Sequence, residues 1–205
     1  MKNIFFDFDG TLINTNKRQY LCLLTTLQKM KLTANISFKK YSDLKKTHLS
    51  NTDIYQLLFP EHNNLNLFLE IFIKNIENIS FLTKDEVLKN SKDYLNEVKN
   101  INLFLVTNRQ NKTKLIMQLR YLGLKKYFNN IILSRNYSTK KEALLSNKVM
   151  VSPNDLFISD DISDFNDLNL NKILINSHKP CMDSKIMVFD DFLSLMNYQK
   201  KNLSW

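Results

Sequence analysis

A short apolar run that leads straight into two acidic residues and a glycine constrains this chain more than any other feature. Residues 4–6 are typical of a strand buried on both faces, and Asp7 and Asp9 follow at once. In an extended segment the two carboxylates would point the same way, and Gly10 would let the backbone turn sharply. Like charges so close repel unless a cation or a shared proton intervenes. A solvated surface loop is the alternative, but D-x-D-G-T directly after an apolar strand favours a functional site.

Size and composition predict a folded globular protein. The chain has 205 residues, 43% of them hydrophobic and 24% charged, which suits one domain or one domain with an insertion. No apolar run approaches the roughly 20 residues of a membrane span. The chain enters its first strand after Met1-Lys2, and cleavage of a signal peptide would remove the motif, so we expect a cytoplasmic protein. Cys22 and Cys181 are too few for a disulfide framework.

The net charge of +9 raises the question of a nucleic-acid partner. The lysines are spread along the whole chain, and no dense basic block or basic and aromatic stripe stands out. We therefore do not expect nucleic acid to be the main partner. Tight DNA binding that falls steeply with salt would contradict this interpretation.

The segment 15–80 is predicted to be helical. Apolar residues recur at three- and four-residue spacing over 20–30 and again over 65–79. Between these stretches, Ser50 and Asp53 have the spacing of a capping box, and Pro60 closes the helix that they begin. We expect an all-helical insertion whose apolar stripes form its own core.

From Phe81 onward, strands and helices alternate. Short apolar runs predict strands at 101–106, 130–133, 156–159, 172–176 and 186–188; helical patterns fall at 87–99, 115–122 and 192–198 and after Thr139. Such alternation implies a parallel sheet with right-handed crossovers. The predicted fold is an α/β, Rossmann-like core of residues 1–14 and 81–205 with helices on both faces of its sheet, interrupted by a helical cap over 15–80.

In parallel sheets, ligand sites lie at the carboxyl ends of the strands. Asp7 and Asp9 end the first strand, residues 107–108 end another, Asp160 ends a third, and Lys140 follows the loop after a fourth. Lys140 stands in the first turn of a helix, where a cation opposes the helix dipole, so a structural role explains it poorly. Together these side chains form a constellation at one edge of the sheet.

The chemistry that this constellation permits is phosphoryl transfer. Oxygen ligands without His or Cys suit Mg²⁺, which binds through one or two carboxylates plus substrate phosphate and water. One Asp could then attack phosphorus, and a second could protonate the leaving oxygen and later activate water. Thr107, backbone amides and Lys140 would hold the charge of the transferring group.

Four ordered motifs resemble those of the haloacid dehalogenase (HAD) superfamily across nearly the whole chain. They are Asp7-Phe-Asp9-Gly10-Thr11, Thr107-Asn108, Lys140 and Ser159-Asp160-Asp161-Ile-Ser-Asp164. The helical insertion is similar to the cap of the phosphoglycolate phosphatase and beta-phosphoglucomutase branch. Since the dehalogenases lack an acid at position 9, Asp9 favours phosphoryl chemistry over carbon–halogen cleavage.

The resemblance implies a role for each motif residue. Asp7 would be the nucleophile and a metal ligand, and Asp9 the general acid/base and a ligand through its backbone carbonyl. Gly10, Thr107 and Asn108 would bind the phosphoryl group, and Lys140 would balance its charge. Asp160 would ligate Mg²⁺, with Asp164 as a ligand or as support. Asp161 either ligates the metal or caps the next helix, and we favour the cap.

The predicted function is a Mg²⁺-dependent phosphatase of a small phosphorylated metabolite that works through a phosphorylated Asp7. The alternatives are a phosphotransferase or phosphomutase with the same nucleophile and a non-catalytic binding module that kept the fold. Gln19 stands where a mutase would have a cap histidine, and His48 lies in a stretch resembling the substrate loop of the family. Lys141 is an alternative to Lys140 as the motif lysine. Both a monomer and a homodimer are compatible with the sequence.

Overall fold

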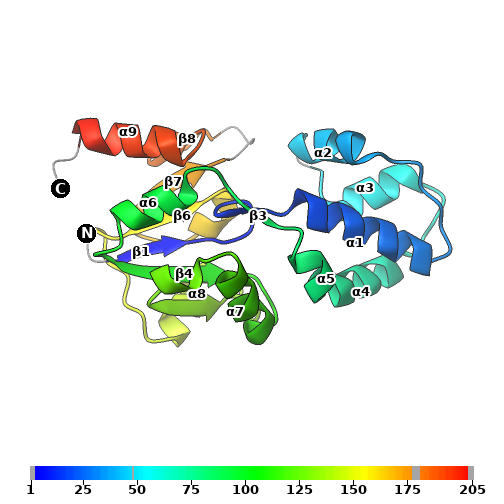
Figure 1. Ribbon diagram of the computed structural model, residues 1–205, viewed down its shortest axis with the longest axis horizontal. Helices are drawn as coiled ribbons and strands as arrows, with labels where there is room; N and C mark the ends of the chain where they lie inside the picture. The colour runs from blue at the N-terminus through cyan, green and yellow to red at the C-terminus, as the bar shows by residue number, and fades with distance from the viewer. Residues whose placement is uncertain (1–2, 48, 177–180, 203–205) are drawn as a thin grey trace. The chain divides into compact units, whose positions relative to one another are not determined.

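The computed structural model describes residues 3–47, 49–176 and 181–202, and the chain divides into two compact units (Figure 1). The first unit is Met1–Asn14 with Glu86–Trp205, and the second is Thr15–Asp85. This division falls after Asp85, whereas the sequence placed the end of the insertion at residue 80. The helix α5 (Ile79–Leu82) and Asp85 belong to the second unit, where the Asp85 carboxylate pairs with Arg18 Nε at 3.2 Å.

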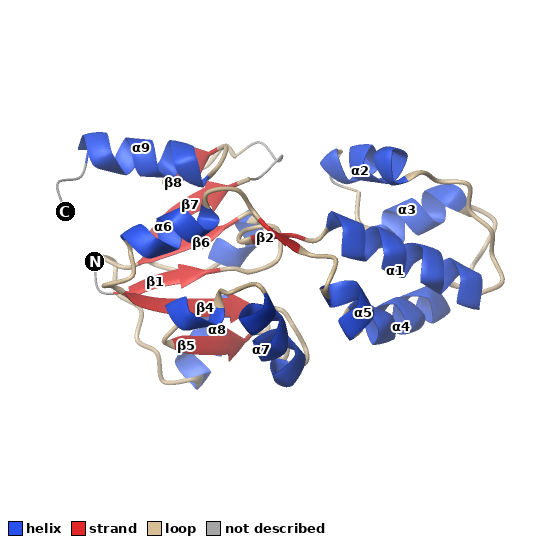
Figure 2. Ribbon diagram, viewed as in Figure 1, coloured by secondary structure: helices blue, strands red, loops and turns tan. Residues whose placement is uncertain are grey.

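The first unit is built on a parallel sheet, which confirms the predicted α/β fold class. In the described part of the chain, six parallel strands lie in the order β5-β4-β1-β6-β7-β8 (Figure 2). Their bounds are β1 (Asn3–Phe6), β4 (Asn102–Thr107), β5 (Asn130–Leu133), β6 (Leu156–Ser159), β7 (Asn171–Ile175) and β8 (Ile186–Phe189). Strand β1 lies between β4 and β6, so the acidic motif that follows it is central in the sheet.

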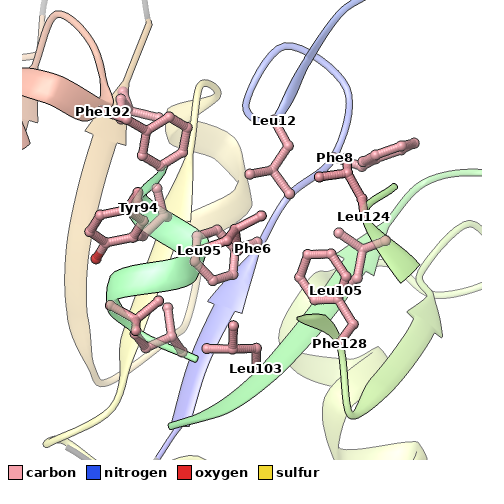
Figure 3. Packing of buried hydrophobic residues seen from close by; sticks show 14 of the residues in the cluster. Phe6, Phe8, Leu12, Tyr94, Leu95, Leu103, Leu105, Leu124, Phe128 and Phe192 are labelled. Carbon is pink, nitrogen blue, oxygen red and sulfur yellow. The ribbon is translucent and has the colours of Figure 1, made fainter. Parts of the chain in front are cut away.

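Alternate residues of β1 serve opposite faces of the sheet, as the period of a strand requires. Ile4 and Phe6 belong to one buried cluster and Phe5 to the other. On the first face, Phe6 lies among Leu95 and other apolar side chains of the helices that cover it (Figure 3). These helices are α6 (Ser91–Glu97), α7 (Lys112–Tyr121) and α9 (Phe192–Asn202); α8 (Lys140–Ser146) and the 3-10 helix η2 (Ile162–Phe165) pack on the other face.

The two segments that connect the units pair with each other. The short strands β2 (Ile13–Asn14) and β3 (Glu86–Val87) run antiparallel, with Ile13 opposite Val87 and Asn14 opposite Glu86. The helix expected over 87–99 therefore begins later, at Ser91, because Val87 is committed to β3 and Asn90 adopts a left-handed conformation (φ 62°).

The second unit has a core of its own, in which Leu27, Tyr55 and Phe68 are buried together. Its helices are α1 (Asn16–Lys29), α2 (Phe38–Lys46), α3 (Asn51–Leu58), α4 (Leu65–Ile76) and α5. The capping box predicted from sequence is present: the Ser50 hydroxyl accepts from the amide of Asp53, and the Asp53 carboxylate accepts from the amide of Ser50. Among the residues that the structure describes, none of the helices combines the length and the apolar character needed to cross a bilayer.

Candidate active site

Asp7 and Lys140 form the centre of the site. Asp7 follows β1 and Lys140 opens α8, and their side chains make a direct ion pair in which the ammonium donates to Oδ1 of Asp7. The same ammonium donates to Oδ2 of Asp164 at 2.6 Å. Asp7 is 8% exposed and Lys140 5% exposed. Three side chains that are distant in sequence thus meet in one buried cluster.

The local sequence around Lys140 explains how a lysine comes to be buried there. Thr139 caps α8, with its hydroxyl accepting from the amide of Glu142, and this cap places Lys140 at the first helical position. Burial alone would lower the pKa of Lys140, but the carboxylates of Asp7 and Asp164 outweigh it and raise that pKa. Lys140 therefore stays charged. Its neighbour Lys141 is exposed, whereas Lys140 is buried in the site.

Asp7 lies where negative charge is crowded. Burial, helped by the nearby carboxylates of Asp164 and Asp160, raises the pKa of Asp7 to about 8, although the Lys140 ammonium acts in the opposite direction. Burial likewise raises the pKa of Asp160 to about 6, against the opposing effect of its hydrogen bond with Thr11. Both shifts arise chiefly from burial, and the neighbouring carboxylates add to them.

Thr11 and Gly10 join the loop after β1 to the end of β6. The Thr11 hydroxyl donates to Oδ1 of Asp160 at 2.8 Å and accepts from the backbone amide of Asp160 at 2.9 Å. Gly10 has a φ of 87° and lies directly against the Asp160 carboxylate. The Thr11 side chain therefore fixes the D-x-D-G-T loop to Asp160. Gly10 permits this close approach because it has no side chain.

Asp9 pairs with Arg109. The guanidinium of Arg109 is bidentate, with Nε 2.5 Å from Oδ2 of Asp9 and the terminal nitrogen 2.7 Å from Oδ1. The ring of Phe8 lies beneath the guanidinium, 5.6 Å from its central carbon. The two acids of the motif consequently have different partners.

Thr107 and Asn108 stand at the same edge of the sheet as Asp7. Strands β1 and β4 are parallel neighbours with Phe6 opposite Leu105, so Asp7, directly after β1, and Thr107, the last residue of β4, lie at the same carboxyl edge. Ser134, just after β5, orders this loop: its amide donates to the Thr107 carbonyl at 2.8 Å, and its hydroxyl donates to Oδ1 of Asn108 at 2.6 Å.

The remaining predicted residues separate into three cases. Asp161 caps η2, with Oδ1 accepting from the amide of Ser163 at 3.0 Å, which supports the capping alternative. Asp164 accepts from Ser159 as well as from Lys140, so it anchors the lysine. His48 lies outside the described residues, and its predicted contact with substrate stays a prediction.

The oxygen donors fit Mg²⁺ as far as their chemistry is concerned. In residues 3–47, 49–176 and 181–202, no three His, Cys, Asp or Glu side chains already form a metal-binding group. Mg²⁺, however, needs only one or two carboxylates when water and substrate oxygens complete its shell. Asp160 lies close enough to Asp7 to raise the pKa of Asp7, and a hard cation bound by both carboxylates would relieve that repulsion.

Sequence reasoning missed the partners of the motif residues. Arg109 directly follows the Thr107-Asn108 motif, and its position beside that motif was the available signal. Ser134 and Asn176 carry no motif signal; the Asn176 amide donates to the Thr11 carbonyl at 3.2 Å. Their importance comes from contacts between different strand ends.

The fold and the site define an α/β protein with a carboxylate and lysine centre at the carboxyl edge of a parallel sheet. Residues 4–190 match the family model described as haloacid dehalogenase-like hydrolase. The chain belongs to this family of hydrolases, as its motifs suggested. A comparison with curated proteins found no significant match.

Solved structures share this fold over nearly their whole length. A protein described as a predicted phosphoglycolate phosphatase from Haemophilus somnus has a TM-score of 0.73 at 16% identity, covering 97% of this chain and 98% of that one. A predicted phosphatase from Clostridium acetobutylicum gives 0.70 at 17% identity, covering 98% of both. The HAD-family protein YfnB of Bacillus subtilis, described as bound to magnesium, gives 0.67 at 13% identity, covering 97% and 98%.

Proposed function

We propose that this protein is a Mg²⁺-dependent phosphatase of small phosphate monoesters that works through a phosphorylated Asp7. The observation that carries the proposal is the buried cluster of Asp7, Lys140 and Asp164 at the end of β1. A carboxylate held beside a fixed ammonium can attack phosphorus while the ammonium balances the charge on the phosphoryl oxygens.

The different partners of the two motif acids support different roles. Asp7 is buried beside Lys140, which suits a nucleophile that must be held in line with phosphorus. Asp9 has the more exposed side chain (29%), where it could reach a leaving group or a water molecule. We assign Asp7 as nucleophile and Asp9 as general acid/base.

The reaction then proceeds in two displacements. Oδ of Asp7 forms a bond to phosphorus as the bond to the ester oxygen breaks, and Asp9 gives its proton to that oxygen. Asp9 next takes a proton from water as the water oxygen attacks phosphorus, which releases inorganic phosphate and restores Asp7. Gly10, Thr107, Asn108 and Lys140 hold the phosphoryl oxygens in both steps.

The residues proposed to hold Mg²⁺ are Asp7, Asp160, Asp164 and the backbone carbonyl of Asp9. When bound, the ion would neutralise the crowded carboxylates and the phosphate, which favours ionised Asp7 at neutral pH. The magnesium described for YfnB is a property of that protein, and it agrees with the oxygen-only donors found here.

We propose that the unit Thr15–Asp85 is a cap that selects the substrate, with His48 as one contact. Its own core and its paired connecting segments suit a separate selecting unit. The side-chain amide of Gln19 is committed to Thr15 and Asn51, at 2.7 and 2.9 Å, and cannot act as a proton carrier as histidine can. This favours a hydrolase over a mutase.

The test is hydrolysis of p-nitrophenyl phosphate with Mg²⁺, with EDTA, and by the Asp7→Asn variant. We expect hydrolysis only by the unaltered protein with Mg²⁺, and transient labelling of Asp7 by the phosphoryl group. Equal rates in all three reactions would disprove the proposal. A panel of phosphorylated metabolites, with released phosphate as the readout, would then identify the substrate and would separate hydrolysis from transfer to an acceptor.

A further inference from the structure

The pairing of Asp9 with Arg109 is at odds with the role proposed for Asp9. Both carboxylate oxygens of Asp9 accept from the guanidinium, at 2.5 and 2.7 Å. In a bidentate pair of this kind, both carboxylate oxygens are engaged by the guanidinium. In this arrangement Asp9 can neither carry a proton to a leaving group nor take one from water.

Arg109 is placed to serve two anions. It follows Thr107 and Asn108, the residues proposed to bind the phosphoryl group, and it reaches Asp9 from the loop after β4. The planar fork of a guanidinium fits a phosphate as well as it fits a carboxylate. A phosphoryl group held by Thr107 and Lys140 would therefore compete with Asp9 for the same nitrogen atoms.

The burial of the two partners sets the direction of the exchange. The Arg109 side chain is only 6% exposed and rests over Phe8, whereas the Asp9 side chain is 29% exposed. The guanidinium has already lost most of its water, so binding a new anion adds little further desolvation. If Asp9 left with no anion to replace it, the buried Arg109 guanidinium would lose its bidentate charge partner, which is unfavourable.

We propose that Arg109 is an exchangeable counterion: it holds Asp9 in the substrate-free enzyme, and the phosphoryl group of the substrate takes over its guanidinium and frees Asp9. No covalent bond changes in this step; two ion pairs exchange partners. Once released, the Asp9 carboxylate takes up a proton from solvent water and can then give it to the leaving oxygen, which couples phosphate recognition to proton transfer. This inference rests on the proposed function.

A double-mutant cycle on phosphate affinity tests the exchange without relying on turnover. The dissociation constant of inorganic phosphate is measured by calorimetry with Mg²⁺ for the unaltered protein, Asp9→Asn, Arg109→Ala and the double variant. We expect Arg109→Ala to weaken phosphate binding about tenfold and Asp9→Asn to tighten it about tenfold, because hydrogen bonds to charged groups have this order of magnitude. In the Arg109→Ala background, Asp9→Asn should give almost no gain.

The cycle separates exchange from simple charge removal. Asp9→Asn removes one negative charge in both backgrounds, so an equal gain in both would mean that Asp9 only repels phosphate and would overturn the inference. Unchanged phosphate affinity in Arg109→Ala would also overturn it. Arg120→Ala, which removes an exposed arginine at the end of α7, is the matched control and should leave affinity unchanged.

Two further measurements keep the result interpretable. Should Arg109→Ala fail to fold, Arg109→Lys keeps the charge but loses the fork, and the gain from Asp9→Asn should shrink in that background. Hydrolysis of p-nitrophenyl phosphate by the unaltered protein is measured in parallel. If the unaltered protein neither hydrolyses p-nitrophenyl phosphate nor binds phosphate, the proposed function is contradicted. If it hydrolyses the ester but Asp9→Asn still raises phosphate affinity in full in the Arg109→Ala background, only the exchange is contradicted.

Discussion

Gly10 and Asp160 approach each other so closely that a Cβ atom on residue 10 would lie 2.1 Å from Oδ2 of Asp160. No real Cβ atom tolerates such a contact, and residue 10 also has a φ of 87°. The glycine thus lets the loop after β1 lie against the acid at the end of β6. This contact brings the first and fourth motifs of the family together.

The Gly10→Ala substitution should therefore impair both the fold and the site. We expect the left-handed backbone alone to lower the free energy of unfolding by at least about 1 kcal/mol. Displacement of Asp160 by the new Cβ atom should lower it further. Gly123→Ala is a close control, since its φ is 70° but its Cβ would meet only the flexible end of Lys92 at 3.6 Å. Thermal unfolding and phosphatase assays of both variants test this, and equal effects would contradict it.

Replacing Lys140 by alanine should abolish most of the activity. The ammonium that balances Asp7 and Asp164 would be lost, and loss of one preorganised charge-stabilising group costs about a hundredfold to a thousandfold in turnover. Lys141→Ala provides the comparison, because Lys141 is exposed and should leave turnover nearly unchanged. The reverse result would move the motif lysine to position 141.

Ser134→Ala should lower kcat/KM about fivefold with little change in thermal stability. The substitution removes the donor that holds the side-chain oxygen of Asn108, a contact worth about 1 kcal/mol. Ser184→Ala, at an exposed turn, serves as the comparison. An unchanged kcat/KM in Ser134→Ala would show that Asn108 holds its position without this hydrogen bond.

The two cysteines should differ in reactivity and in their response to pH. Burial raises the pKa of Cys22 to about 12 from 9.0, so roughly one molecule in ten thousand carries the thiolate at pH 8. Iodoacetamide should therefore label the half-buried Cys181 first and Cys22 only after unfolding. Mass spectrometry of labelled peptides, with and without denaturant, measures the difference; comparable rates in the folded protein would contradict it.

The same shift sets the sign of a pH effect on stability. Between pH 9 and about 12 the folded state keeps the Cys22 proton that the unfolded chain gives up. The unfolded state then binds fewer protons, so this contribution to stability is full below pH 9 and declines as the pH rises. Cys22→Ala should make the alkaline loss of stability smaller; an unchanged alkaline loss would count against this.

Sequence patterns predicted the strands correctly where successive residues are all buried. Strands β1, β4 and β6 are apolar runs buried on both faces, and such runs are recognisable without a structure. The capping box at Ser50 was equally local. Helix α2 escaped notice because only one of its side chains, Tyr41, is buried, which leaves little apolar periodicity to detect.

The candidate site divides in the same way. Asp7 follows β1 and Lys140 opens α8, so the topology of a parallel sheet was enough to predict that these two residues meet. The partners of these residues were not predictable, because Arg109, Ser134 and Thr11 act through contacts between distant segments. Their role depends on which loop lies beside which, and no local pattern contains that information.

The pairing of β2 with β3 has a consequence for how such a chain can diversify. Because Asn14 lies opposite Glu86, the polypeptide leaves the sheet-bearing unit and re-enters it at neighbouring positions. A tight reverse turn could bridge that gap, so the excursion between these positions can lengthen, shorten or be exchanged while the register of every sheet strand is preserved. Under the proposed cap role, substrate selectivity could then change through insertions and exchanges in this unit while the strands that carry the proposed site keep their pairing.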